Sequence, residues 1–264
     1  MDYSQYECLK VSLNDGLIRI SINRPEALNA INAQLHDELS DVIHKIDQDR
    51  AVDVAILTSE GRAFCAGGDL EWLLGVHGNV AESAELIRND RRLQTAFLEL
   101  EKPIIARVTG PAIGLGCSLA LYCDFVYADP TARFADPHVS VGLVAGDGGA
   151  VLWPQLVGHM KAKRYLLTGD AVTAEDAAAM GLITEVVPED ELDATVDKMA
   201  QRLLKGPKYA IRFTKASINA SLKQVASVTM DRAAAYEGMS MMMDDHKIAL
   251  EAFIAREKPK FIGS

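Results

Sequence analysis

One pattern occurs twice in the chain, as VDVAILTSEGRAFCAGGDL at residues 52–70 and as IIARVTGPAIGLGCSLA at residues 104–120. Each copy begins with a short apolar run typical of a buried strand and continues into a glycine-rich turn that opens toward a helix. Glycine lets the backbone approach a ligand closely, and the start of a helix offers N–H groups that have no partner. A single turn of this kind can be no more than a tight loop. Two of them predict a pair of N–H groups that hold one oxygen atom, an oxyanion hole.

The rest of the chain alternates in the same way between strand and helix patterns. Residues 9–22 show the pattern of a hairpin around Asn14-Asp15-Gly16, and residues 31–46 repeat apolar side chains at helical spacing. Further strands are expected at residues 52–58, 104–108, 125–128 and 183–187, and further helices at 81–100, from 117, and at 162–167, 174–180, 190–204 and 207–220. This alternation predicts an α/β fold. We expect residues 1–190 to form the core and residues 191–264 to form a C-terminal helical region of the same domain.

Composition and charge limit the possible functions. The 264 residues, 49% apolar and 24% charged, are typical of one large globular domain with a full hydrophobic core. The net charge of −10 disfavours a general binder of nucleic acid. No apolar run approaches the ~20 residues of a membrane span, and the first residues do not resemble a secretory signal. We therefore expect a cytoplasmic protein with neither a nucleic acid nor a membrane as partner.

The signatures of several other chemistries are weak or missing. The four cysteines form no CxxC pair and none lies beside a histidine at zinc-ligand spacing, so we expect structural thiols and no metal site. There is no phosphate-binding P-loop and no serine in a GxSxG context. Gly114-Leu115-Gly116 begins like a dinucleotide-binding motif, but its third glycine is missing. A dinucleotide-binding oxidoreductase stays open as an alternative.

Three segments, in order along the chain, resemble a known family. RPEALNA (residues 24–30) and GRAFCAGGDL (residues 61–70) look like the first two signatures of the crotonase (enoyl-CoA hydratase/isomerase) superfamily. GPAIGLGCSLA (residues 110–120), followed by Cys123-Asp124, resembles the third. Similar residues continue from Gly142 to Val187, so the resemblance covers nearly the whole chain.

The resemblance implies a crotonase-like spiral of ββα units with a C-terminal helical trimerisation region, and hence a homotrimer or homohexamer. It implies an acyl-CoA substrate, with coenzyme A as part of that substrate and no separate cofactor. The implied activity is that of a lyase or isomerase of fatty acid metabolism that stabilises a thioester enolate.

The resemblance also assigns residues to these roles. It places the oxyanion hole at the backbone N–H groups of Gly68 and Leu115. The residues that it assigns to CoA binding are Arg24, Glu26, Ala27, Leu28 and Ala66. Lys260 either meets a CoA phosphate or is an ordinary solvated lysine.

The chain departs from the family where typical hydratases carry two glutamates. Ser118 and His138 stand at those positions. Serine does not act as a general base near pH 7 without a neighbouring base, so Ser118 positions water or substrate at best. His138 can move protons, since its unperturbed pKa is ~6.5. In some relatives a catalytic aspartate occupies the turn at Gly146, one residue before Asp147. Asp147 is therefore either a catalytic carboxylate or the cap of the following helix.

Two hypotheses about activity remain beside the oxidoreductase. The first is an enzyme in which His138, Asp147 and Ser118 serve a thioester enolate by hydration, isomerisation, hydrolysis or C–C cleavage. The second is a catalytically impaired crotonase-like protein that only binds acyl-CoA. The acyl group is not predictable, because residues far apart in the chain line its pocket.

Overall fold

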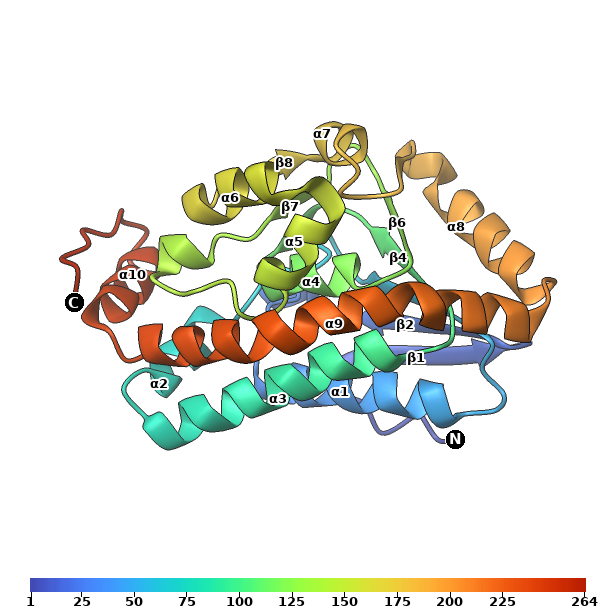
Figure 1. Ribbon diagram of the computed structural model, residues 1–264, viewed down its shortest axis with the longest axis horizontal. Helices are drawn as coiled ribbons and strands as arrows, with labels where there is room; N and C mark the ends of the chain where they lie inside the picture. Colours follow the sequence, from blue (N-terminus) through green and yellow to red (C-terminus); the bar gives the residue numbers. More distant parts are fainter.

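The computed structural model describes all residues, 1–264, and contains two sheets surrounded by helices (Figure 1). The larger sheet has the order β1-β2-β3-β4-β6-β9, in which only the first pair is antiparallel. Its strands are β1 (Leu9–Asn14), β2 (Leu17–Ile22), β3 (Val54–Ser59), β4 (Ile104–Val108), β6 (Phe125–Ala128) and β9 (Glu185–Val186). The smaller sheet contains β5 (Pro111–Ile113), β7 (Arg133–Ala135) and β8 (Val172–Thr173) in that order. The prediction of an α/β fold is confirmed.

Helices cover both faces of the larger sheet. On one face, α1 (Ala33–Gln48), α3 (Val80–Glu99) and α9 (Lys208–Ser240) run side by side (Figure 1). On the other face, α8 (Glu189–Leu204) packs against side chains of β3, β4 and β6. The remaining helices are α2 (Leu70–Val76), α4 (Leu115–Leu121), α5 (Gly149–Val157), α6 (His159–Thr168), α7 (Ala174–Ala179) and α10 (Asp244–Ile254). None of the helices is long and apolar enough to span a membrane.

The sequence pattern explains the main layer. Ile18, Ile20 and Ile22 alternate along β2 and are fully buried in the largest apolar cluster, which also contains the buried stripe of α1. The Asn32 side chain caps α1 by accepting a hydrogen bond from the N–H of Leu35 at 2.9 Å. The sequence missed α2 and the smaller sheet, whose strands of two or three residues are too short to show a period. It also ended α9 about twenty residues too early.

The two glycine-rich turns meet where the two sheets approach each other. The first turn follows β3, and the second follows β5. A parallel bridge joins Cys65 to Ala112, with the N–H of Ile113 donating to the carbonyl of Cys65 at 2.9 Å. A second bridge joins Ile31 to Gly68. These bridges hold the turns side by side at the edge of a cavity.

Candidate active site

The first wall of the cavity is made of main chain. Gly67 and Gly114 have φ angles of +91° and +55°, which favour glycine. A Cβ atom at Gly67 would lie 3.0 Å from the carbonyl oxygen of Ile113, so the close approach of the two turns also requires glycine. We call residues 67–68 and 114–115 the turn wall.

The turn wall presents two free N–H groups. Gly68 and Leu115 both line the cavity, and neither backbone N–H donates a hydrogen bond within the chain. These are the residues that the sequence predicted for the oxyanion hole. Unpaired N–H groups at a buried edge are costly unless a ligand or water accepts from them. The arrangement therefore suits an oxygen atom that gains negative charge during a reaction.

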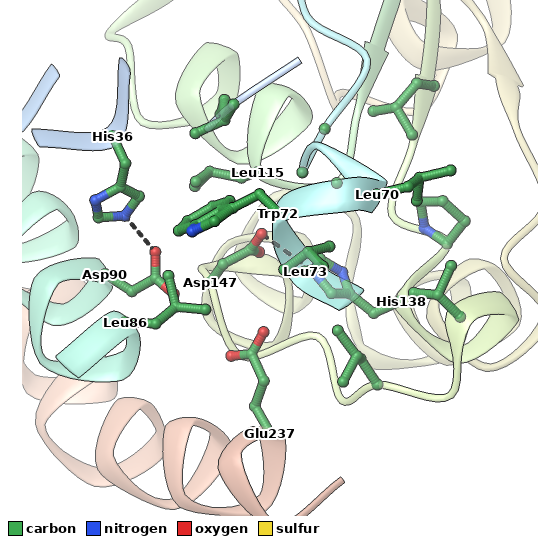
Figure 2. A pocket seen from close by; sticks show the side chains of 18 of the residues that line it. His36, Leu70, Trp72, Leu73, Leu86, Asp90, Leu115, His138, Asp147 and Glu237 are labelled. Carbon is green, nitrogen blue, oxygen red and sulfur yellow. Dashed lines mark hydrogen bonds and ion pairs between the residues drawn. The ribbon is translucent and has the colours of Figure 1, made fainter. Parts of the chain in front are cut away.

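The second wall is a chain of acidic and basic side chains. His138 Nε2 lies 3.1 Å from Asp147 Oδ2, an ion pair that Figure 2 shows as a dashed line. The Ser118 hydroxyl donates to Asp147 Oδ1 at 3.2 Å, and His138 Nδ1 is hydrogen-bonded to Asp136. We call Ser118, His138, Asp147 and Asp136 the acid wall; His138 and Asp147 line the cavity, and the other two contact them from outside it. The structure thus brings all three predicted catalytic residues together and adds Asp136.

The charges in the acid wall favour a protonated histidine. Burial would lower the pKa of His138, but the negative charges of Asp147 and Asp136 and their hydrogen bonds raise it well above its usual value. An imidazolium between two carboxylates donates from both ring nitrogens. His138 then orients Asp147 and is not itself a free base at neutral pH.

Asp147 does not cap the helix that follows it. The N-cap of α5 is Gly148, and no side chain makes a capping hydrogen bond there. The turn that contains Asp147 is instead held by two helices. Gln94 of α3 donates to the carbonyl of Gly146 at 3.2 Å. Ser240 of α9 accepts from the N–H of Val144 at 3.3 Å. Of the two interpretations of Asp147, the structure therefore excludes the capping one.

Three further ionisable residues line the cavity, and sequence analysis missed all of them. His36 Nε2 lies 2.6 Å from Asp90 Oδ1, a buried pair between α1 and α3. Burial raises the pKa of Asp90 despite its hydrogen bond to His36. Glu237 of α9 points into the same cavity (Figure 2). Its signal was present, because Glu237 falls on the buried stripe of α9.

The cavity has a volume of about 120 Å³, and apart from the polar groups described above its lining is apolar. Its apolar lining consists of Ile31, Leu70, Trp72, Leu73, Leu86, Ile113, Leu115, Val141, Leu143 and Met241, together with Ala66 and Pro137. Hydrophobic walls with a few converging polar groups are the usual form of a small-molecule site.

Most of the predicted CoA-binding residues lie next to the turn wall. The N–H of Ala66 donates to the carbonyl of Leu28 at 3.1 Å, and Arg24 Nη2 lies 3.5 Å from Asp69. Glu26 and Ala27 belong to the adjoining 3₁₀ turn. Lys260 is exposed in the C-terminal tail and makes no hydrogen bond or ion pair within the chain.

One cluster in the chain has side-chain atoms close enough together to bind a metal ion. It consists of Asp136, His138 and Asp147, whose possible ligand atoms lie within 4.8 Å of one another. A histidine must be neutral to bind a metal, whereas the raised pKa of His138 favours its cation. The chemistry of this donor set therefore fits a proton network better than a metal centre. The four cysteines are all buried and free, and burial raises the pKa of Cys65 to about 12.

Comparison with known proteins identifies the family. The model of the enoyl-CoA hydratase/isomerase family matches residues 12–264. The chain is 34% identical to a crotonyl-CoA hydratase from Syntrophomonas wolfei over 98% of this chain and 99% of that protein. It is 31% identical to a 1,2-epoxyphenylacetyl-CoA isomerase from Escherichia coli over 94% and 95% of the two chains. A solved enoyl-CoA hydratase/isomerase from Mycobacterium paratuberculosis superposes with a TM-score of 0.91 at 34% identity, over 94% and 99% of the two chains.

The chain therefore belongs to the enoyl-CoA hydratase/isomerase family, and its fold is crotonase-like, as the resemblance implied. It is an acyl-CoA-processing enzyme of this type. The oxidoreductase alternative is wrong. The strand order of the larger sheet increases from one edge to the other, so it lacks the reversal at which dinucleotides bind.

Proposed function

We propose that the enzyme binds the carbonyl oxygen of an acyl-CoA thioester between the N–H groups of Gly68 and Leu115 and forms its enolate there. A carbonyl oxygen becomes strongly basic when charge moves onto it, and preorganised N–H donors stabilise that charge. Leu115 contributes its main-chain N–H to this hole, so other side chains at this position keep the donor.

We infer that Asp147 is the base of this site. A single observation carries the inference: Asp147 lines the cavity beside the turn wall and accepts from both Ser118 and His138. The two hydrogen bonds fix its orientation, and the His138 cation compensates its charge. Ser118 and His138, which stand where the resemblance places glutamates, act through Asp147 in this scheme.

A carboxylate in the cavity argues against the alternative of a protein that only binds acyl-CoA. It also widens the set of reactions, because one base beside an enolate supports a double-bond shift as well as the addition of water. The names of the two relatives, a crotonyl-CoA hydratase and a 1,2-epoxyphenylacetyl-CoA isomerase, support hydration and isomerisation of a CoA thioester as reaction types.

The CoA moiety is proposed to lie along residues 24–28 and Ala66, whose main chain leads to the first turn. We also propose a homotrimer or homohexamer. Supporting this, α9 carries exposed apolar side chains at Tyr209, Phe213 and Ile218, which a partner chain would cover. Light scattering at micromolar protein tests the assembly, and a mass of 28.6 kDa would contradict it.

A panel of acyl-CoA thioesters tests the function directly. Ligand binding is measured by thermal shift and turnover by the mass of the product. A ligand at ~100 times its dissociation constant adds ~2.7 kcal/mol to the apparent stability. We expect at least one thioester to bind and to be converted. A panel in which none is bound would contradict the proposal, and binding without conversion would favour the impaired alternative.

A further inference from the structure

Glu237 is a buried carboxyl group that no other part of the chain satisfies. Only 4% of the residue is exposed, and it makes no side-chain hydrogen bond or ion pair within the chain. Asp90 differs in this respect, since it is bonded to His36. Its carboxyl group faces the cavity, so a ligand there, or water that the ligand meets, is the partner that this polar group needs.

Its position is next to the acid wall. A Cβ atom at Gly146 would overlap the Oε2 atom of Glu237, so the carboxyl group fills the space where a side chain of residue 146 would lie. Gly146 does not have a positive φ, so its backbone does not require glycine. Glycine is needed at this position because the Glu237 carboxyl group occupies the space that a side chain would take. Helix α9 thus supplies a carboxyl group at the corner where the neighbouring Asp147 enters the cavity (Figure 2).

The surroundings favour the protonated form of this carboxyl group. Burial raises the pKa of Glu237 well above its usual value. The His138 cation opposes that shift, and the charges of Asp90, Asp147 and Asp136 add to it. These groups face Glu237 from α3 and from the acid wall, while α5, the other helix packed closely against this part of α9, has no ionisable side chain. Glu237 therefore differs from Asp147, whose two hydrogen bonds suit a proton acceptor.

We propose that Glu237 is the proton donor of the site and works beside Asp147 on the enolate formed in the turn wall. This inference rests on the proposed function. As Asp147 accepts a proton from water or from a substrate carbon, electrons move onto the thioester oxygen. The O–H bond of Glu237 then breaks, and its proton forms a C–H bond with the electron pair of the enolate, which restores the carbonyl. The proton on Asp147 returns to the Glu237 carboxylate, so the site is unchanged after one turnover.

Glu237→Gln tests the proposal because it keeps the size of the side chain and removes the transferable proton. With the substrate from the thioester panel, turnover should fall ~10²–10⁴-fold. The KM should change little, and the decline of turnover at high pH should disappear. Asp231→Asn is the matched control, since it makes the same change from carboxyl to amide at an exposed position of α9 outside the cavity. The control should keep both turnover and pH profile close to those of the wild type.

Two further readouts keep the test decisive. Glu237→Asp retains an acid and should exceed the Gln variant in turnover; equal rates would overturn the proposal. Infrared difference spectra of wild type minus Glu237→Gln at neutral pH should show the carbonyl band of a protonated carboxylic acid, whatever the substrate. Absence of that band, or wild-type turnover and pH profile in the Gln variant, would overturn the role of Glu237. A wild type that binds no thioester would instead contradict the proposed function.

Discussion

The two walls of the cavity are built in different ways. The turn wall uses main-chain atoms from two neighbouring turns, fixed by two isolated bridges. The acid wall uses side chains from α4 and from two loops, and Glu237 joins them from a helix about 90 positions later in the chain. A main-chain donor survives most substitutions at its own residue, whereas a side-chain acid is lost by a single one. In the proposed function, the common chemistry of the enolate therefore rests on the turn wall, and the particular reaction rests on the acid wall.

The largest effect is expected from Asp147→Asn. The variant keeps the shape of the side chain but removes its basicity, so turnover should fall ~10²–10⁴-fold while thioester binding persists. Asp170→Asn, at an exposed carboxylate without a side-chain partner, is the control. If steady-state kinetics showed wild-type turnover for Asp147→Asn, the acid wall would not contain the base.

Gly68→Pro should follow, with turnover lowered ~10²–10³-fold, because proline has no N–H to donate to the thioester oxygen. Gly68→Ala is the matched control. It keeps the N–H, and its Cβ meets only the end of the Leu73 side chain, at 2.8 Å. Leu115→Ala should stay within about tenfold of the wild type, since its donor is main chain. Equal losses in the Pro and Ala variants of Gly68 would show that space, and not the N–H, matters there.

His138→Gln tests the charge in the acid wall through stability. Two carboxylates raise the pKa of His138 in the folded chain above the ~6.5 of an unfolded one. The stabilisation is therefore full below pH ~6.5 and is lost as the pH rises through the folded-state pKa. Urea unfolding should show a deficit of about 1.5–3 kcal/mol for the variant at low pH that shrinks as the pH rises. A deficit that grows with pH would contradict a protonated His138.

Ser118→Ala should have the smallest effect. It removes one hydrogen bond to the Asp147 carboxylate, while the ion pair with His138 still orients that carboxylate, so turnover should fall at most about tenfold. A loss as large as that of Asp147→Asn would mean that Ser118 contacts the reacting atoms itself. Single-turnover kinetics separate the two cases.

The difference between the walls also explains how far the sequence could be interpreted. The turn wall is local, so the glycines at 67 and 114 and the strands β3 and β4 that lead toward the two turns were visible as patterns. Ser118, His138 and Asp147 were found through the resemblance, which fixed their places without showing that they touch. The hydrogen bonds between them could be found only from the structure, because 29 positions separate Ser118 from Asp147.

Asp136, His36, Asp90 and Glu237 were missed for a physical reason. Each is a polar residue that is itself buried, and burial of a polar residue depends on packing between distant elements. Asp136 stands two residues before His138, which was a usable signal for a partner. Glu237 occupies the stripe of α9 that also contains Ala233 and Ser240, which marked it as buried. The sequence did not show that this stripe meets the turn of Asp147.

Exchange of the α-protons of a saturated thioester, butyryl-CoA, in D₂O tests most directly whether the turn wall forms an enolate and the acid wall moves its proton. Mass spectrometry follows deuterium at the α-carbon, and no complete reaction is needed. The wild type should incorporate deuterium, and both Gly68→Pro and Asp147→Asn should do so far more slowly, the latter while still binding the thioester. Exchange at the wild-type rate in either variant, or no exchange in a wild type that binds butyryl-CoA, would contradict the account.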